Sequence, residues 1–264
     1  MSSEEPILYT SENGVVRITL NRPDRLNAFN ADMNRKFADA LDRARAEAGI
    51  RVLVLAAAGR GFCAGQDLSD VQSDADAPPA DLGDTIEQFY NPVVRKLRAL
   101  PFPVVAAVNG TAAGAGANLA FAADIVIAAK SAKFLQAFCK IGLLPDCGGT
   151  WWLPRLVGPA RAAGLAMLGE PLGAEKAAEW GLIWKAVDDA QFADEVHALA
   201  AHLAKQPTRA LAAIKAALQA SWHRDLDAQL DAERDHQRDL GFSHDYREGV
   251  AAFLAKRPPH YRGN

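Results

Sequence analysis

Four short apolar segments, alternating with helical patterns, constrain the fold of this chain more than any other feature. They are residues 15–20, 51–56, 103–108 and 125–128. Residues 15–20 alternate and are rich in branched residues, as in a half-buried strand, and the branched and small apolar residues of the other three are also typical of strands. Since helical crossovers connect parallel neighbours, this alternation predicts an α/β core with a parallel sheet.

The clearest helical pattern follows the first of these segments. Asn30 is a good N-cap, and apolar residues recur every three or four positions over residues 33–44. A second helix is expected over residues 85–100. Between the two, residues 59–65 form a glycine-rich turn, and the Asp-rich residues 69–83 are expected to form a mobile loop.

The pattern changes after Asp188, where helical segments follow one another without strands. The predicted helices are residues 191–205, 207–221, 226–240 and 244–255. A domain boundary is expected near residue 200. We therefore expect a core of ββα units over residues 1–200 and a C-terminal helical subdomain over residues 201–264.

Composition and charge exclude several classes of function. Half of the 264 residues are hydrophobic and the net charge is −3, so neither a nucleic acid nor an anionic membrane is an expected partner. No apolar run approaches the roughly 18 residues of a membrane span, and the polar start is unlike a targeting signal. The three cysteines form no paired framework, and no histidine precedes His197. These features predict a cytoplasmic protein without a metal.

A glycine-rich stretch, residues 61–68, follows the second strand segment. Most such stretches are simple turns. Glycine also allows a turn in which a main-chain N–H, here that of Gln66, is exposed to a ligand. The residues alone leave both interpretations open.

A second glycine-rich stretch, residues 110–118, lacks the third glycine and the following acidic residue of a dinucleotide-binding fingerprint. Its small residues favour close packing of a helix on a strand. They also fit a helix start whose free N–H groups stabilise developing negative charge.

Asp146 stands between Pro145 and two glycines, close to Trp151 and Trp152. Asp in such a turn is most often a helix N-cap or the first residue of an Asx-turn. Alternatively, apolar neighbours desolvate the carboxylate and raise its pKa towards that of a general base. The sequence leaves both roles open.

Together these stretches resemble one family, the crotonase superfamily of enoyl-CoA hydratases and isomerases. The resemblance extends nearly end to end and is most specific at residues 21–28, 62–68, 108–110, 114–116 and 246–249. It implies an α/β spiral of ββα turns with a C-terminal helical part that builds a homotrimer or a dimer of trimers. It also implies an acyl-CoA thioester substrate and no separate cofactor, since coenzyme A is part of the substrate.

Members of this superfamily polarise the thioester carbonyl with two main-chain N–H groups, which the resemblance assigns to Gln66 and Ala115. This oxyanion hole stabilises the enolate that forms when the carbon beside the thioester loses a proton. Hydratases of the superfamily also carry two glutamates, whose positions hold Asn118 and Phe138 here. Because water addition needs a carboxylate pair, efficient hydration is not expected. Asp146 is then expected to act alone, taking a proton from one carbon and returning it two carbons away.

The resemblance also assigns the walls of the site. Phe253 and Lys256 of the tail are expected to close over coenzyme A. From its composition and its position after the first turn alone, the loop at residues 69–83 is expected to be a lid over the acyl group. The other expected coenzyme A and acyl contacts are Arg25, Leu26, Ala28, Ala64, Asp67, Leu68, Gly116, Asn118, Phe138, Leu143 and Trp151.

Within the superfamily, the stretches around Phe89, Asp146 and Tyr246 look like those of isomerases that convert epoxyphenylacetyl-CoA to a seven-membered oxepin in phenylacetate degradation. They are also similar to enzymes that move a β,γ double bond into conjugation. Two alternatives remain. In the first, Asp146 is the nucleophile of an aroyl-CoA dehalogenase, although residues 67–100 lack the histidine that such enzymes use. In the second, the chain is a non-catalytic subunit that binds CoA esters.

Overall fold

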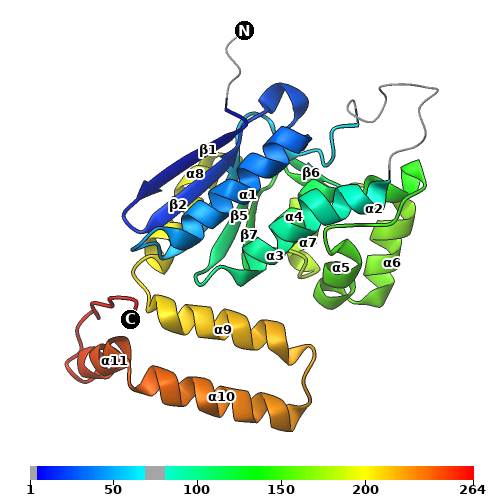
Figure 1. Ribbon diagram of the computed structural model, residues 1–264. Coiled ribbons are helices and arrows are strands. Elements are labelled where there is room, and N and C mark those ends of the chain that lie inside the picture. The colour runs from blue at the N-terminus through cyan, green and yellow to red at the C-terminus, as the bar shows by residue number, and fades with distance from the viewer. Residues whose placement is uncertain (1–4, 69–80) are drawn as a thin grey trace.

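The computed structural model describes residues 5–68 and 81–264. Within them the main sheet has six strands in the order β1-β2-β3-β5-β7-β10 (Figure 1). All neighbours pair in parallel except β1 and β2, so the four predicted strands and their parallel pairing are confirmed. The strands are β1 (Ile7–Glu12), β2 (Val15–Leu20), β3 (Val52–Ala57), β5 (Val104–Val108), β7 (Ile125–Ala129) and β10 (Lys185–Val187).

Shorter strands in the described ranges form a second sheet in the order β4-β6-β8-β9. They are β4 (Gly61–Cys63), β6 (Thr111–Ala113), β8 (Lys133–Leu135) and β9 (Leu172–Gly173). The first three follow β3, β5 and β7, so each turn of the chain gives one strand to each sheet before a helix begins. This repeat is the ββα arrangement predicted from the sequence.

Helix α1 (Ala31–Ala46) covers one face of the main sheet, as the sequence predicts. Its N-cap is Asn30, whose side-chain oxygen accepts a hydrogen bond from the Met33 N–H at 2.9 Å. Met33, Phe37 and Leu41 are fully buried in the main hydrophobic core. The apolar stripe of this helix therefore fixes how it lies on the sheet.

The second predicted helix is divided into α2 (Leu82–Thr85), a π-helical turn η3 (Ile86–Tyr90) and α3 (Asn91–Ala99). A π-helical turn shifts the phase of the side chains that follow it. Tyr90, at its end, is buried with its ring edge-on to Phe29, the centroids 6.4 Å apart.

Helix α8 (Phe192–Leu203) covers the opposite face of the sheet (Figure 1). Val52 and Val54 of β3 belong to the apolar cluster beneath α8, whereas Leu53 and Leu55 belong to the cluster beneath α1. A strand buried on both faces reads as a continuous apolar run, which is why β3 was easy to predict.

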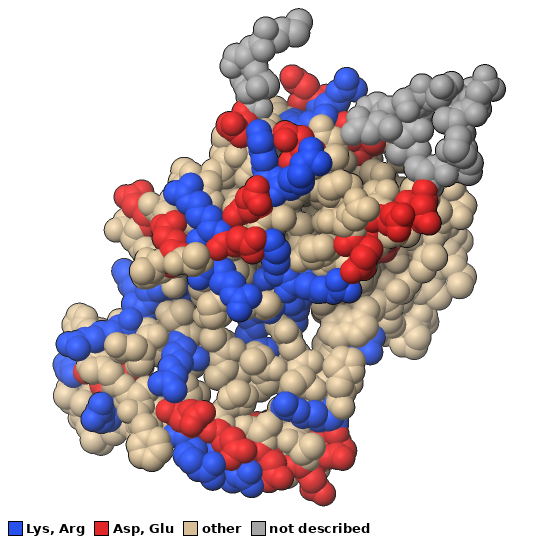
Figure 2. Space-filling model, in the orientation of Figure 1, with Lys and Arg blue, Asp and Glu red and all other residues tan. Residues whose placement is uncertain are grey.

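The last three helices of the chain lie to one side of the core (Figure 1). They are α9 (Thr208–Ser221), α10 (Leu226–Gly241) and α11 (His244–Leu254). The boundary expected near residue 200 falls within α8, whose packing on the sheet extends to Ala204. Mixed acidic and basic side chains cover the outer face of α10 (Figure 2). No helix within the two described ranges is long and apolar enough to cross a membrane.

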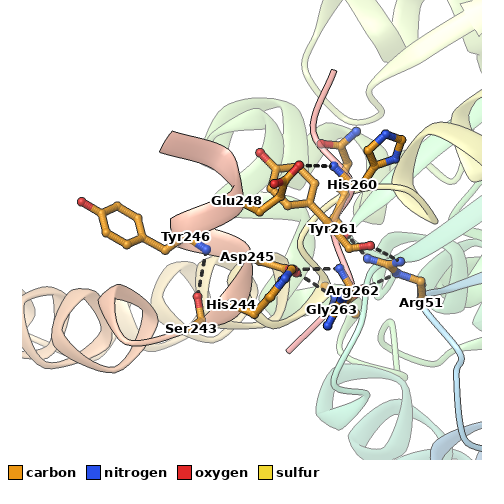
Figure 3. A network of polar contacts seen from close by, with 12 residues as sticks. Arg51, Ser243, His244, Asp245, Tyr246, Glu248, His260, Tyr261, Arg262 and Gly263 are labelled. Atoms are coloured by element: carbon orange, nitrogen blue, oxygen red, sulfur yellow. Dashed lines mark hydrogen bonds and ion pairs between the residues drawn. The ribbon is translucent and has the colours of Figure 1, made fainter. Parts of the chain in front are cut away.

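The last residues of the chain are held against α11 and the core (Figure 3). The Asp245 carboxylate accepts hydrogen bonds from the main-chain N–H groups of Arg262 and Gly263, both at 2.7 Å. From the other side, the Arg51 guanidinium, just before β3, donates to the Tyr261 carbonyl oxygen at 3.1 Å. The tail thus ties the helical region to the main sheet.

Candidate active site

A cavity of about 470 Å³ brings together segments that are far apart in the sequence. Among its lining residues are the three expected catalytic positions, Gln66, Ala115 and Asp146. Its size and composition suit an apolar organic group. The other lining residues are mostly small or apolar: Ala64, Gly65, Leu68, Leu82, Gly114, Ala137, Phe138, Lys140, Ile141 and Leu143.

The turn after β4 carries Gln66. Gly65 in this turn has a φ of +93°, which favours glycine, and a Cβ on it would lie 3.4 Å from the Ala115 nitrogen. Glycine therefore lets the turn approach the start of the helix that begins at Ala115 closely. Phe29 holds the turn in a short parallel bridge, donating its N–H to Gly65 at 2.7 Å and accepting from Asp67 at 2.9 Å. This bridge does not use the N–H of Gln66.

Helix α4 (Ala115–Phe121) supplies the second main-chain donor. Gly114 before it has φ +53° and ψ −127°, a conformation that few other residues adopt. Ala115 is the first helical residue, so its N–H has no partner within the helix. In the described part of the chain, neither this N–H nor that of Gln66 takes part in a hydrogen bond. Two such donors beside an apolar cavity can stabilise an oxyanion.

Asp146 lies in the loop between η4 (Ala137–Ile141) and α5 (Gly149–Val157). The N-cap position of α5 is Gly148, so the carboxylate is not the helix cap that its sequence context suggests. Within the described residues, its Oδ1 atom is buried and accepts no hydrogen bond. Burial raises the pKa of Asp146 above its usual value, and the neighbouring Cys147 thiol offsets part of this rise. A carboxylate in this state is suited to proton transfer.

Cys147 shapes the loop without being reactive. Its φ of +48° lies in the left-handed region, which is rare for a residue with a side chain. Its carbonyl oxygen accepts a hydrogen bond from the indole N–H of Trp152 at 3.0 Å. Burial, together with the adjacent Asp146, raises the pKa of its thiol, so the thiol stays protonated.

Four residues expected to contact coenzyme A lie around the first turn and outside the cavity lining. Asp67 is buried and forms an ion pair with Arg22 at 2.9 Å. Ala28 is also buried, and its carbonyl oxygen accepts a hydrogen bond from the same Arg22. The Leu26 carbonyl oxygen accepts a hydrogen bond from the N–H of Ala64, the first residue of the turn. Arg25 is exposed. Asp67, Ala28 and Leu26 therefore stabilise the turn on the side away from the cavity.

Gly116, Asn118 and Trp151 also lie outside the cavity lining. Gly116 is buried where α4 passes β4, and a Cβ on it would lie 2.5 Å from the Cys63 Cβ. Asn118 is fully buried, and its side-chain amide is bonded to protein atoms. Trp151, expected in the apolar wall, instead stacks on Trp222 just after α9, with ring centroids 4.5 Å apart. Each of the three has a structural partner that its place in the sequence does not reveal.

The tail residues Phe253 and Lys256 lie at α11, apart from this cavity. Phe253 is 83% exposed and lines a separate pocket of about 400 Å³. Lys256 follows the end of the same helix. Of the expected lid at residues 69–83, residues 69–80 lie outside the described residues. Leu82, beyond them, lines the cavity.

Sequence reasoning missed Lys140 and Ile141 of η4, which both line the cavity. Ile141 follows Phe138 by three positions, and a helical turn there would have indicated that the two share a side. No pattern in the sequence marks Lys140, which adds a cation to a mostly apolar wall. In the described ranges, no group of three or more His, Cys, Asp or Glu could hold a metal ion.

Residues 10–264 match the family model for enoyl-CoA hydratase/isomerase. The chain belongs to the enoyl-CoA hydratase/isomerase family. It is 58% identical over 259 residues to the 1,2-epoxyphenylacetyl-CoA isomerase of Escherichia coli, with 98% of this chain and 99% of that protein covered. It is 37% identical to the trans-2-decenoyl-[acyl-carrier-protein] isomerase of Streptococcus mutans serotype c, with 97% and 98% covered.

Among solved structures, the enoyl-CoA hydratase of Mycobacterium smegmatis matches with a TM-score of 0.91 at 30% identity, with 98% of this chain and 99% of that chain covered. The predicted crotonase superfamily and the α/β spiral with C-terminal helices are therefore confirmed. The enoyl-CoA hydratase/isomerase family is a family of enzymes, so the prediction that this chain is an enzyme is confirmed.

Proposed function

We propose that this chain is an isomerase of acyl-CoA thioesters that works with one carboxylate. The observation that carries the proposal is the cavity in which Asp146, with its raised pKa, meets the main-chain N–H groups of Gln66 and Ala115. Within the described residues, Asp146 is the single acidic side chain in its lining. One base and one oxyanion hole suffice to move a proton between two carbons of one molecule.

In the proposed reaction, the thioester carbonyl oxygen accepts hydrogen bonds from Gln66 and Ala115. The Asp146 carboxylate removes a proton from the carbon beside the thioester, and the electron pair moves onto the carbonyl oxygen as an enolate. Asp146 then returns the proton to a carbon two positions further along, and the enolate collapses to the thioester. Phe138 and Leu143 in the cavity wall keep water from the intermediate.

The proposed substrate is 1,2-epoxyphenylacetyl-CoA and the proposed product is its oxepin isomer. The carbon–carbon bond shared by the epoxide and the six-membered ring opens, its electrons form the new double bonds of the seven-membered ring, and the proton transfer moves one hydrogen from the carbon beside the thioester to a ring carbon. This choice rests on the 58% identity to the Escherichia coli 1,2-epoxyphenylacetyl-CoA isomerase. A cavity of about 470 Å³ with the Phe138 ring in its wall suits a cyclic acyl group. The same proton transfer would convert a 3-enoyl-CoA to its conjugated 2-enoyl isomer, which we propose as a second reaction of the site.

Water addition is not part of the proposed function. Asn118, at one of the expected glutamate positions of a hydratase, is buried and bonded to protein atoms. Phe138, at the other position, contributes an aromatic ring. Since the described lining residues include no carboxylate besides Asp146, none is left to activate water.

We also propose a cytoplasmic homotrimer or dimer of trimers in which Phe253 and Lys256 of a second copy complete the coenzyme A site. Several large apolar side chains are exposed in one chain, including Met167 at 76%, Trp184 at 74% and Phe253 at 83%. Contact between copies would remove such side chains from water. Light scattering after size-exclusion chromatography tests the assembly, and a monomer at micromolar concentration would contradict it.

The conversion of a 3-enoyl-CoA to its conjugated isomer, followed by ultraviolet absorbance, is the first test of the function. Wild type and Asp146→Asn are compared, and product masses are checked for added water. The epoxide substrate is assayed next, with products separated by chromatography and their masses determined by mass spectrometry. We expect isomerisation without water addition, and its loss in the variant. An inert wild type, or an equally active variant, would overturn the proposal.

A further inference from the structure

The buried side-chain amide of Asn118 is bonded at both ends. Its Nδ2 donates to the main-chain carbonyl oxygen of Asp146 at 2.8 Å, and its Oδ1 accepts from Nε2 of Gln136 at 2.9 Å. Asn118 is 0% exposed and Gln136 is 3% exposed, so both hydrogen bonds are shielded from water. Buried bonds of this kind fix geometry, because breaking one leaves a polar atom without a partner.

These two hydrogen bonds connect three walls of the cavity. Gln136 immediately precedes η4, which carries the ring of Phe138. Asn118 lies about one helical turn after Ala115, the second main-chain donor. Asp146 carries the carboxylate. The two amides therefore help to set the position of the base relative to the oxyanion hole.

The loop needs this anchor because Oδ1 of the Asp146 carboxylate has no partner among the described residues and so does not tie the loop to another segment. Cys147 and Gly148 after it are both left-handed, with φ of +48° and +78°, so the chain turns sharply. The main chain holds the loop instead: the Asp146 carbonyl oxygen accepts from the Gly149 N–H at 2.7 Å as well as from Asn118. A Cβ on Gly149 would lie 2.3 Å from Asn118 Nδ2, so the amide is seated tightly against the loop.

We propose that Asn118, oriented by Gln136, is the positioning residue of the proton shuttle. It aims the Asp146 carboxylate at the two carbons between which the proton moves, and in this it rests on the function proposed above. The amide of Asn118 gives the Asp146 carbonyl oxygen a second donor, from outside the loop, beside the main-chain N–H of Gly149. A carboxylate at position 118 would face the Asp146 carbonyl oxygen, and two acceptors cannot bond to each other. This accounts for Asn at position 118 in place of the glutamate of the hydratases.

Two variants of nearly unchanged shape test this role. Asn118→Asp replaces the donor to Asp146 by an acceptor, and Gln136→Met removes the donor to Asn118 at similar volume. Gln229→Met is the matched control, because Gln229 is a half-buried glutamine of α10 whose Nε2 donates to the Ala217 carbonyl oxygen at 3.5 Å, within the helical region.

The assay measures kcat, KM and, in deuterium oxide, the ratio of deuterium incorporated beside the thioester to isomer formed. A base held in the productive position returns the abstracted proton to the substrate before it exchanges with solvent. A displaced base exchanges the proton for solvent deuterium first. We expect Asn118→Asp to lower kcat about 10- to 100-fold with KM within about threefold, and Gln136→Met to lower kcat less. The ratio is expected to rise in both variants. Gln229→Met is expected to change none of the three quantities.

Unchanged kcat and an unchanged ratio in both variants, with an active wild type, would overturn the positioning role and leave the proposed function standing. A fall in kcat with an unchanged ratio would also overturn it, because a smaller folded fraction gives that result. If Asn118→Asp does not fold, Gln136→Met decides between these results. An inert wild type is a separate outcome, in which the proposed function fails and the positioning role fails with it.

Discussion

The ammonium group of Lys215 and the carboxylate of Asp124 form an ion pair of 2.9 Å where α9 meets the core. Lys215 also donates to the main-chain carbonyl oxygens of Leu97 and Phe102, both at 3.3 Å. Its side chain is 7% exposed, and burial lowers its pKa. The helical region is thus joined to the core by a buried cation as well as by apolar contacts.

Replacing Lys215 by Met is expected to lower the free energy of unfolding by about 2 kcal/mol, because Asp124 and two carbonyl oxygens lose a donor in a buried place. Chemical denaturation measures the change. Lys205→Met, at an exposed lysine after α8, is the control and is expected to shift stability by less than about 0.5 kcal/mol. Equal losses in the two variants would show that the junction does not depend on this cation.

Asp146→Asn is expected to lower kcat by about 10²- to 10⁴-fold and, at neutral pH, to raise the melting temperature. The gain in stability follows because burial raises the pKa of Asp146, so the folded state holds its ionised form at a cost. Calorimetry and the isomerase assay on the same sample measure both effects. A variant that is inactive because it is unfolded would contradict this prediction.

The same raised pKa predicts a pH dependence of known sign. Below the unfolded pKa of about 3.9, Asp146 is protonated in both states and the two proteins should be equally stable. As pH rises from the unfolded pKa towards the raised folded pKa, only the unfolded state ionises easily, so wild type should become less stable than Asp146→Asn; above the folded pKa the difference should stay constant. The acid limb of kcat/KM should also have its midpoint above the usual Asp range. Melting curves and rates taken across this pH range check both statements.

Gly116→Ala is expected to destabilise the protein by about 1–3 kcal/mol, because the new Cβ would lie 2.5 Å from the Cys63 Cβ. The clash should push α4 away from β4 and shift the N–H of Ala115, lowering kcat by about tenfold or more. Gly164→Ala in α6 (Pro159–Leu168) is the control, since a Cβ on Gly164 would have no neighbouring atom within 4 Å among the described residues. It should keep full activity and gain up to about 1 kcal/mol.

Glu248→Gln is expected to loosen the carboxyl-terminal tail. The Glu248 carboxylate accepts a hydrogen bond from the His260 N–H at 2.7 Å (Figure 3). It also accepts from both terminal nitrogens of Arg257, and these contacts lower its pKa to about 2. Because the folded pKa is lowered, these contacts stabilise the folded state above the unfolded pKa of Glu248, and this stabilisation is lost as pH falls through about 2. Carboxypeptidase digestion at neutral pH measures release of the tail. Glu233→Gln on α10 is the control, and equal digestion of both variants would reject the prediction.

Strands β3, β5 and β7 were predictable because each is a nearly continuous apolar run buried on both faces, and β2 because its buried residues alternate with half-buried ones. Strand β1 escaped prediction because it lies at the sheet edge and is mostly exposed, so its sequence carries little pattern. Strands β4, β6, β8 and β9 have two or three residues each, which is too short for any periodicity. Their positions depend on neighbours that are distant in the sequence.

Within the site, glycine and proline mark the unusual backbone around Gln66, Ala115 and Asp146, but the roles expected of these residues came from the resemblance to the family. The hydrogen bonds of the Asn118 side chain could not be predicted, since its partners Gln136 and Asp146 are 18 and 28 residues away in the sequence. Trp151 gave no signal either, because an aromatic side chain packs equally well against a ligand or another ring.

The bridge between Phe29 and the turn at Gln66 has a consequence for how the protein is made. Phe29, near the start of the chain, holds the turn at Gln66, while the second proposed donor is Ala115 and the proposed base is Asp146. During synthesis from the amino terminus, the ribosome must therefore release more than half of the chain before the site can close. An incomplete chain that ends before Asp146 would lack the carboxylate on which the proposed reaction depends.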